Sequence, residues 1–174
     1  MDDAELIAQI RQFAYDLHVY LGTGLLEKVY ENGLKHRMEK AGFDVEAQYP
    51  LEVRDEDGFI LGNYNADLYV NKRIVIELKS AKAITNEHYA QILNYLKITN
   101  RPVGLLINFG SFKFEARTVY LRTHSSSFLP FSTAKKDDVT IRDDSRVETE
   151  KCRSVAGPHP STFPPFSTAE IPHG

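Results

Sequence analysis

The sequence predicts an α/β fold in which a mixed β-sheet packs against helices. Two observations carry this prediction: apolar residues recur at helical spacing at the start of the chain, and short apolar runs separated by turn signals follow them. The predicted order is two helices, three strands, a helix and two strands, which is typical of a mixed sheet with helices packed on it. In 174 residues, a hydrophobic fraction of 42% can furnish one such core.

Two helices are expected at the start of the chain. The first ends at residues 22–24, where two glycines break the run, and the second extends from about residue 25 to residue 40, where Gly42 stops it. The apolar stripe of the first helix consists of Leu6, Ile10, Phe13, Leu17 and Leu21, and the core-facing stripe of the second consists of Glu27, Tyr30, Leu34, Met38 and Ala41.

Three extended segments come next, at residues 43–53, 59–70 and 73–79, and the turn signal Asp-Glu-Asp-Gly separates the first two. A helix at residues 86–98 follows and is closed by Asn-Arg-Pro. The continuous apolar run at residues 103–107 is typical of a buried central strand, and residues 112–121 supply the final strand.

The composition changes near His124. Residues 124–174 contain thirteen Ser or Thr and six of the eight prolines, with little apolar periodicity, and residues 124–134 recur imperfectly as residues 159–169. Such a segment cannot bury enough surface to offset the entropy lost on ordering. We therefore expect a folded domain at residues 1–123 and a low-complexity, disordered tail at residues 124–174.

Composition excludes several classes of protein. The single cysteine, Cys152, excludes an internal disulfide framework and any zinc site built from two or more thiolates of this chain. An acidic amino terminus and the lack of an apolar run of about 20 residues indicate a cytoplasmic protein without a membrane partner. The net charge of −3 counts against a nucleic-acid partner, because DNA-binding domains usually carry a basic excess.

Charged residues interrupt the apolar strand at residues 74–79. Glu77 and Lys79 are two positions apart and so lie on one face with Val75. Burying a charge costs several kcal/mol unless the charge is paired or binds a metal. The two residues are therefore either a structural ion pair or part of a functional site.

A second carboxylate, Asp67, is on the preceding strand. We expect Ala66, Leu68 and Val70 to form the apolar face of that strand and Asp67 to lie on its other face. A two-residue loop after that strand would set Asp67 opposite Ile76, whereas a three-residue loop at residues 71–73 sets it opposite Glu77. We predict the three-residue loop. Two carboxylates would then converge, and their mutual repulsion calls for a divalent cation.

Two helices offer further polar candidates, each with an ordinary alternative. Glu27 opens a core-facing stripe, but a first-turn acid is also what the helix dipole prefers. His88, Gln91 and Tyr95 share one face of the later helix, and they would equally form a solvated polar edge.

The combined pattern resembles a known family. Asp67, followed after nine residues by Glu77-Leu78-Lys79, resembles the D-x(n)-E-x-K signature of the PD-(D/E)XK nuclease superfamily, whose core order is α-β-β-β-α-β. Residues 24–30, Gly-Leu-Leu-Glu-Lys-Val-Tyr, resemble the motif of the GxxExxY family, a bacterial branch of that superfamily. The resemblance covers about residues 5–121, including His18 and the stretches at residues 65–68, 91–97 and 103–110.

The resemblance implies a restriction-endonuclease-like core and a metal-dependent nuclease that hydrolyses phosphodiester bonds of DNA. It implies that Asp67 and Glu77 bind Mg²⁺ or Mn²⁺, with the backbone carbonyl of Leu78 as a further ligand, and that Lys79 orients or activates the attacking water. Glu27 would complete the metal shell directly or through water. Gln91 and Tyr95 would position the phosphate or the nucleophile. A lone His on a helix, such as His18, is more often packed or capping than catalytic.

Two other functions remain open at the level of sequence. One is a catalytically inactive nucleic-acid- or protein-binding module on the same fold, which the net acidity and the lack of an evident Lys/Arg cluster favour. The other is an interaction protein that works through its Pro/Ser-rich tail. Without the tail, 15 basic and 17 acidic side chains remain, so one divalent cation would make the core formally neutral.

Overall fold

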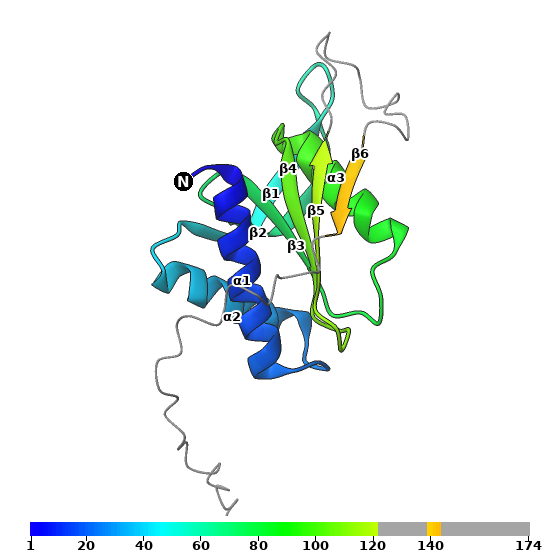
Figure 1. Cartoon of the computed structure of the whole chain (residues 1–174). Helices are drawn as coiled ribbons and strands as arrows, with labels where there is room; N and C mark the ends of the chain where they lie inside the picture. Colours follow the sequence, from blue (N-terminus) through cyan, green and yellow to red (C-terminus); the bar gives the residue numbers. More distant parts are fainter. Residues whose placement is uncertain (122–138, 144–174) are drawn as a thin grey trace, which may run out of the picture.

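The computed structural model describes residues 1–121 and 139–143, which form one six-stranded sheet and three helices (Figure 1). In chain order the elements are α1 (Asp3–Leu21), α2 (Glu27–Lys40), β1 (Val45–Arg54), β2 (Ile60–Val70), β3 (Ile74–Lys79), α3 (Asn86–Thr99), β4 (Val103–Asn108), β5 (Glu115–Leu121) and β6 (Val139–Asp143). The predicted α/β fold with a mixed sheet is confirmed. No helix in the described part of the chain is both long and apolar enough to cross a membrane.

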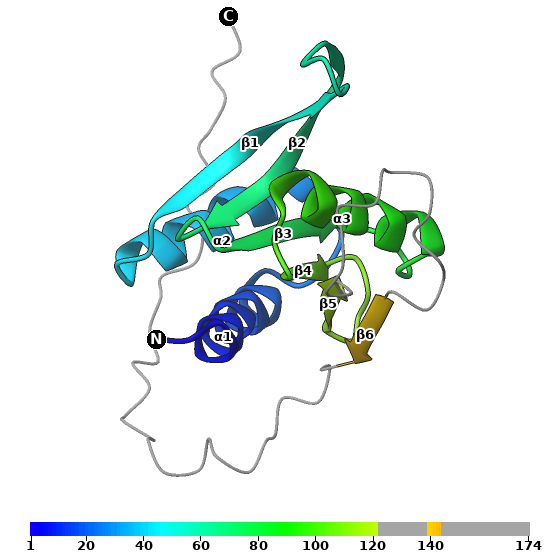
Figure 2. The same cartoon turned by 90° about the horizontal axis from the view of Figure 1, so that it is seen from above.

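The strands follow one another across the sheet in the order β1-β2-β3-β4-β5-β6. Among the strands of the described residues, only β3 and β4 pair in parallel, and α3 makes the connection between them. Helices α1 and α2 lie on one face of the sheet and α3 on the other, and the β1–β2 hairpin extends beyond the rest of the sheet (Figure 2). The sheet therefore separates two apolar clusters, one beneath each set of helices.

The caps and packing of α1 follow from its sequence. Asp2 and Glu5 form a reciprocal capping box at its start, and Gly22, with a φ of 68°, ends it. Leu6, Ile10 and Leu17 are buried against the sheet and α2, as the helical spacing predicts. A Cβ added to Gly33 of α2 would lie 3.0 Å from Leu17 Cδ1, so the glycine lets the two helices approach closely.

A second glycine sets the distance between α3 and the sheet. A Cβ on Gly104 of β4 would lie 2.9 Å from the carbonyl oxygen of Val75 and 3.1 Å from Leu96 Cδ2. Ile92 and Leu96 of α3 pack into the space that the missing side chain leaves. Gly104 thereby holds β3, β4 and α3 together on the face where Glu77 and Lys79 lie.

The register between β2 and β3 confirms the predicted three-residue loop. Val70 lies opposite Ile74, so residues 71–73 form the connection, and the pairing continues to Leu68 opposite Ile76. The pairing ends there, and Asp67 and Glu77 are the next residues on the two strands. The two carboxylates are therefore neighbours on adjacent strands.

The β1–β2 hairpin changes its packing face at Asp67, which the sequence did not predict. Leu68 and Val70 pack on the α1 and α2 side, but Ala66 packs on the α3 side, so the predicted common face for these three residues is wrong. The physical reason lies in β1, where Gln48 has a φ of 52° and lies between the pairs that Leu68 and Ala66 form. A left-handed residue interrupts the alternation of a strand, and the paired strand turns with it.

The expectation of a wholly disordered tail is also wrong for residues 139–143. These residues form β6, which pairs antiparallel with β5 and sets Ile141 opposite Val119. The segment Val-Thr-Ile has the β-branched composition that strands favour, and β6 covers what would otherwise be an edge of the sheet. The imperfect repeat at residues 124–134 and 159–169 lies outside the described residues.

The close approach at Gly104 gives a test of the packing. We expect Gly104→Ala to lower the free energy of unfolding by about 1–3 kcal/mol, because the added methyl group meets backbone and packed side chains. Gly62→Ala is the matched control in β2, since nothing lies within 4 Å of its added Cβ. Urea denaturation measures both, and equal losses would contradict the close packing of α3 on β3 and β4.

Candidate active site

The candidate site begins where β2 and β3 separate. The ladder between them ends at Leu68 and Ile76, and beyond that point the backbone N–H of Leu78 donates to Asp67 Oδ2 at 2.7 Å. In a regular antiparallel ladder a backbone carbonyl would accept this hydrogen bond. The Asp67 side chain thus replaces the backbone of β2, which fixes its carboxylate beside the end of β3.

Glu77 and Lys79 lie on the α3 face of β3, at its carboxyl end. Glu77 is only 1% exposed, and Lys79 Nζ donates to its Oε1. The other oxygen, Oε2, is buried and has no hydrogen-bond partner among the described residues. Such an orphaned carboxylate oxygen is costly unless a ligand or water satisfies it, so it marks a place where a cation would fit.

Burial raises the pKa of all three acidic residues that were predicted for the site. The pKa of Glu77 rises to about 8, because burial disfavours its charged form and the Asp67 carboxylate repels it, against the opposing effect of Lys79. Burial is also the main cause of the raised pKa of Asp67 and of Glu27. The folded protein without a cation therefore disfavours the charged form of each of these three carboxyl groups.

Lys79 keeps its proton in this setting. Burial acts to lower its pKa, but the hydrogen bond to Glu77 and the charges of Glu27 and Asp67 outweigh burial, and the pKa is raised. Lys79 is thus an ammonium group held among carboxylates. An ammonium can orient a water or a phosphate oxygen, but it cannot accept a proton.

Glu27 reaches the site from the first turn of α2. Its Oε2 accepts the backbone N–H of Ser80 at 3.2 Å, and Ser80 Oγ in turn donates to the carbonyl oxygen of Leu25 at 2.9 Å. No side-chain hydrogen bond caps α2 at Leu26. Since Glu27 binds the chain that follows β3, the structure favours a place in the site over a simple capping role.

The other residues of the Gly-x-x-Glu-x-x-Tyr motif hold Glu27 in place. Gly24 has a φ of 96°, which a glycine adopts readily. Tyr30 is fully buried, stacks on Phe109 with ring centroids 4.5 Å apart, and donates from its hydroxyl to the carbonyl oxygen of Gly22 at 2.9 Å. The loop before α2 is thereby fixed, and with it the direction in which Glu27 points.

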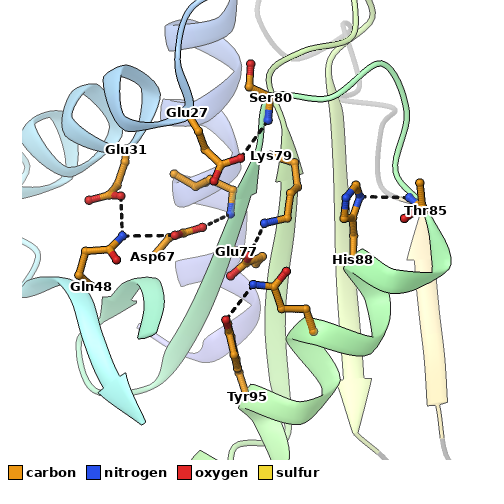
Figure 3. Close-up of polar contacts among 12 residues, drawn as sticks. Glu27, Glu31, Gln48, Asp67, Glu77, Lys79, Ser80, Thr85, His88 and Tyr95 are labelled. Atoms are coloured by element: carbon orange, nitrogen blue, oxygen red, sulfur yellow. Dashed lines mark hydrogen bonds and ion pairs between the residues drawn. The ribbon is translucent and has the colours of Figure 1, made fainter. Parts of the chain in front are cut away.

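Of the three candidates on α3, Gln91 and Tyr95 lie near the acidic residues, whereas His88 does not. Gln91 Nε2 donates to the Tyr95 hydroxyl at 2.8 Å, and Tyr95 is 3% exposed. Burial raises the Tyr95 pKa, and the nearby charges of Glu77 and Asp67 add to the rise, which places this hydroxyl beside the carboxylates (Figure 3). His88 instead accepts the backbone N–H of Thr85 in a capping box and serves the helix.

His18 does not join the site. Its Nε2 lies 2.8 Å from the carbonyl oxygen of Ser111, and its ring contacts Phe109 and Phe114. It belongs to the cluster between α1 and the β4–β5 loop. The alternative of a packed histidine is the one that the structure supports.

Two site residues are missing from the sequence-based prediction. Glu31 is 3% exposed, and its Oε2 accepts from Gln48 Nε2 at 2.8 Å; the same nitrogen lies 3.4 Å from Asp67 Oδ1 (Figure 3). Lys28 Nζ lies 2.5 Å from Glu31 Oε1. Glu31 lies four residues after Glu27 and three before Leu34, so its helical spacing was a signal that could have identified it. Gln48 has the character of an ordinary strand residue and carries no such signal.

The residues in place suit a hard divalent cation in chemistry, although they do not form a finished cage. Among the described residues, no three His, Cys, Asp or Glu side chains are grouped closely enough to hold a metal ion. Asp67, Glu77 and Glu27 offer carboxylate oxygens, the donors that Mg²⁺ and Mn²⁺ prefer, and Glu77 Oε2 is unsatisfied. Such an ion would take the unpartnered Oε2 of Glu77, while Oε1 accepts from Lys79.

The described domain matches a known family. Residues 4–119 match the family model described as the PD-(D/E)XK nuclease superfamily. No curated protein and no solved structure matches the chain. The matched range extends from α1 into β5 and contains every residue of the candidate site.

The raised pKa of Glu77 predicts how stability depends on pH. In the unfolded chain this carboxyl releases its proton near pH 4.5, but in the folded metal-free protein it holds the proton to about pH 8. The free energy of unfolding should therefore fall as pH rises from about 5 to 8, by up to about 1.4 kcal/mol per pH unit from this group. Urea denaturation in EDTA measures this slope.

Glu77→Gln provides the control for this prediction, because its amide does not titrate. The free energy of unfolding of the variant should change less with pH than that of the wild-type chain over the same range. Parallel curves for the two proteins would show that Glu77 does not hold a proton in the folded state.

Proposed function

Because the chain belongs to the PD-(D/E)XK nuclease superfamily, whose members are mostly nucleases, we propose that it is a metal-dependent nuclease that hydrolyses phosphodiester bonds of DNA. The observation that supports the proposal most is the meeting of Asp67, Glu77 and Lys79 where β2 and β3 separate. The motif at residues 24–30 resembles that of the GxxExxY family, and this resemblance supports the further proposal that the protein belongs to that branch of the superfamily.

Asp67 and Glu77 would hold Mg²⁺ or Mn²⁺, with Glu27 completing the shell directly or through water and the Leu78 carbonyl as a further ligand. The unsatisfied Glu77 Oε2 supports this assignment. When bound, such a cation lowers the pKa of a coordinated water and offsets negative charge on the phosphate. It would also offset the burial and the repulsion between acids that raise the pKa values of Glu77 and Asp67.

Lys79 acts as a cation in this proposal. Its raised pKa argues against a role as a general base, because the ammonium form persists at neutral pH. The ammonium would orient the attacking water through a hydrogen bond and offset charge that develops on the phosphate oxygens.

Gln91 and Tyr95 would contribute position and not proton transfer. Their mutual hydrogen bond fixes both side chains on one turn of α3, close to the Glu77 carboxylate. A raised pKa keeps the Tyr95 hydroxyl protonated, so it remains a hydrogen-bond donor toward a phosphate oxygen or a water.

A catalytically inactive binding module is the second candidate. The observation in its favour is the ion pair between Lys79 and Glu77, which already satisfies one oxygen of the buried carboxylate without any metal. In that case the wild-type protein would leave nucleic acid intact in the presence of Mg²⁺ or Mn²⁺.

Substitutions at the two ends of the site test the proposed activity. We expect Lys79→Ala and Asp67→Asn each to reduce cleavage of single- and double-stranded DNA about 10²- to 10³-fold, because each removes charge stabilisation or a metal ligand. Lys40→Ala, at the exposed far end of α2, is the control and should cleave like the wild-type protein. Melting curves of all variants report whether they fold.

EDTA should abolish the activity of the wild-type protein, and added Mn²⁺ should restore it. Cleavage that persists in both site variants and in EDTA would contradict the proposal, since it would come from another site or from another protein.

A further inference from the structure

Gln48 occupies a strained backbone position directly beside the candidate site. It lies in the middle of β1, between Ala47 opposite Leu68 and Tyr49 opposite Ala66, and it therefore faces Asp67 across the hairpin. Its φ of 52° is left-handed, whereas strand residues have a φ near −140°. For a residue other than glycine, this backbone conformation is unfavourable by on the order of 1–3 kcal/mol. It persists only where the surrounding structure imposes it.

The side chain of Gln48 connects two carboxylates. Its Nε2 donates to Glu31 Oε2 at 2.8 Å and lies 3.4 Å from Asp67 Oδ1. An amide nitrogen carries two hydrogens, so it can serve both oxygens at once, and the carbonyl end of the amide could serve neither. The two acids thus determine which way the amide points.

Asp67 is held by two different strands as a result. The Leu78 N–H of β3 binds Oδ2 at 2.7 Å, and the Gln48 amide of β1 approaches Oδ1 at 3.4 Å. Two directional contacts on one carboxylate fix its rotation about the bond to Cβ. The contact at 3.4 Å is long for a hydrogen bond, so Oδ1 retains a lone pair for a stronger ligand.

Glu31 supplies the fixed end of this arrangement. It is 3% exposed and comes from α2, one turn after Glu27, with Lys28 paired to its other oxygen. The Glu31 carboxylate repels Asp67, and the hydrogen bond from Gln48 acts in the opposite sense on the Asp67 pKa. A neutral amide between them offsets this repulsion without adding a positive charge that would compete with a cation.

We propose that Gln48 is a positioning residue that orients the Asp67 carboxylate as a metal ligand, and that Glu31 anchors Gln48 in this role. The inference rests on the proposed function, because it concerns the same metal site. It gives the strained backbone of β1 a purpose, since an extended residue at this position would place its side chain on the other face of the hairpin. Groups that orient metal ligands typically contribute 10- to 100-fold to metal affinity.

Two variants separate orientation of Asp67 from stability of the hairpin. Gln48→Gly removes the amide and relieves the left-handed strain, whereas Gln48→Ala removes the amide and keeps the strain. In the full chain without metal, the glycine variant should therefore melt at a higher temperature than the alanine variant. Both should bind Mn²⁺ about 10- to 100-fold more weakly than the wild-type protein in calorimetry.

Gln12→Ala is the matched control. Gln12 Nε2 also donates to a carboxylate, Asp16 Oδ1 at 2.9 Å, but both residues are on the outer surface of α1. This variant should bind Mn²⁺ with wild-type affinity.

The inference is overturned if both Gln48 variants bind Mn²⁺ as tightly as the wild-type protein, because Gln48 then only shapes the hairpin. It is equally overturned if only Gln48→Ala, the variant with the lower melting temperature, loses affinity for Mn²⁺ and Gln48→Gly binds Mn²⁺ like the wild-type protein. A wild-type chain that fails to bind Mn²⁺ would instead overturn the proposed function, and this inference with it. Calorimetric titration of Mn²⁺ into the wild-type protein and the two Gln48 variants distinguishes these three results.

Discussion

The hydrogen bond from the Leu78 N–H to Asp67 Oδ2 is the interaction on which the candidate site depends. It forms where the β2–β3 ladder ends, and it substitutes a side-chain oxygen for a backbone carbonyl. Asp67 thereby satisfies a main-chain donor of β3 and lies beside Glu77. The site arises because two paired strands separate at a carboxylate and not at an apolar residue.

Charge accumulates at this point because the fold tolerates it there. Val75 of β3 packs against α3 on one face, and Ile76 and Leu78 pack against α1 and α2 on the other, so β3 is secured by apolar contacts on both sides. Within this frame Glu77 leaves one buried oxygen without a partner among the described residues. Local rules of polar satisfaction are broken where the rest of the fold can support the cost, which is typical of functional sites.

Sequence patterns predicted the parts of the site that depend on strand parity. The loop at residues 71–73 had to be odd in length for Asp67 to meet Glu77, and the observed register agrees. The patterns could not predict the contact between Gln48 and Glu31, because it depends on a left-handed backbone angle and on the approach of α2 to the hairpin. The composition of residues 124–174 also did not predict β6, because residues 139–143 form a strand through pairing with β5, which is distant in sequence.

The central claim is that Asp67 and Glu77 together form a metal site at the separation of β2 and β3. A crystal structure of the full chain grown with Mn²⁺, with anomalous diffraction data, tests it most directly. We expect an anomalous peak roughly 2.0–2.2 Å from an oxygen of Asp67 and from Glu77 Oε2. An intact pair between Glu77 and Lys79 with no peak beside Asp67 would contradict it.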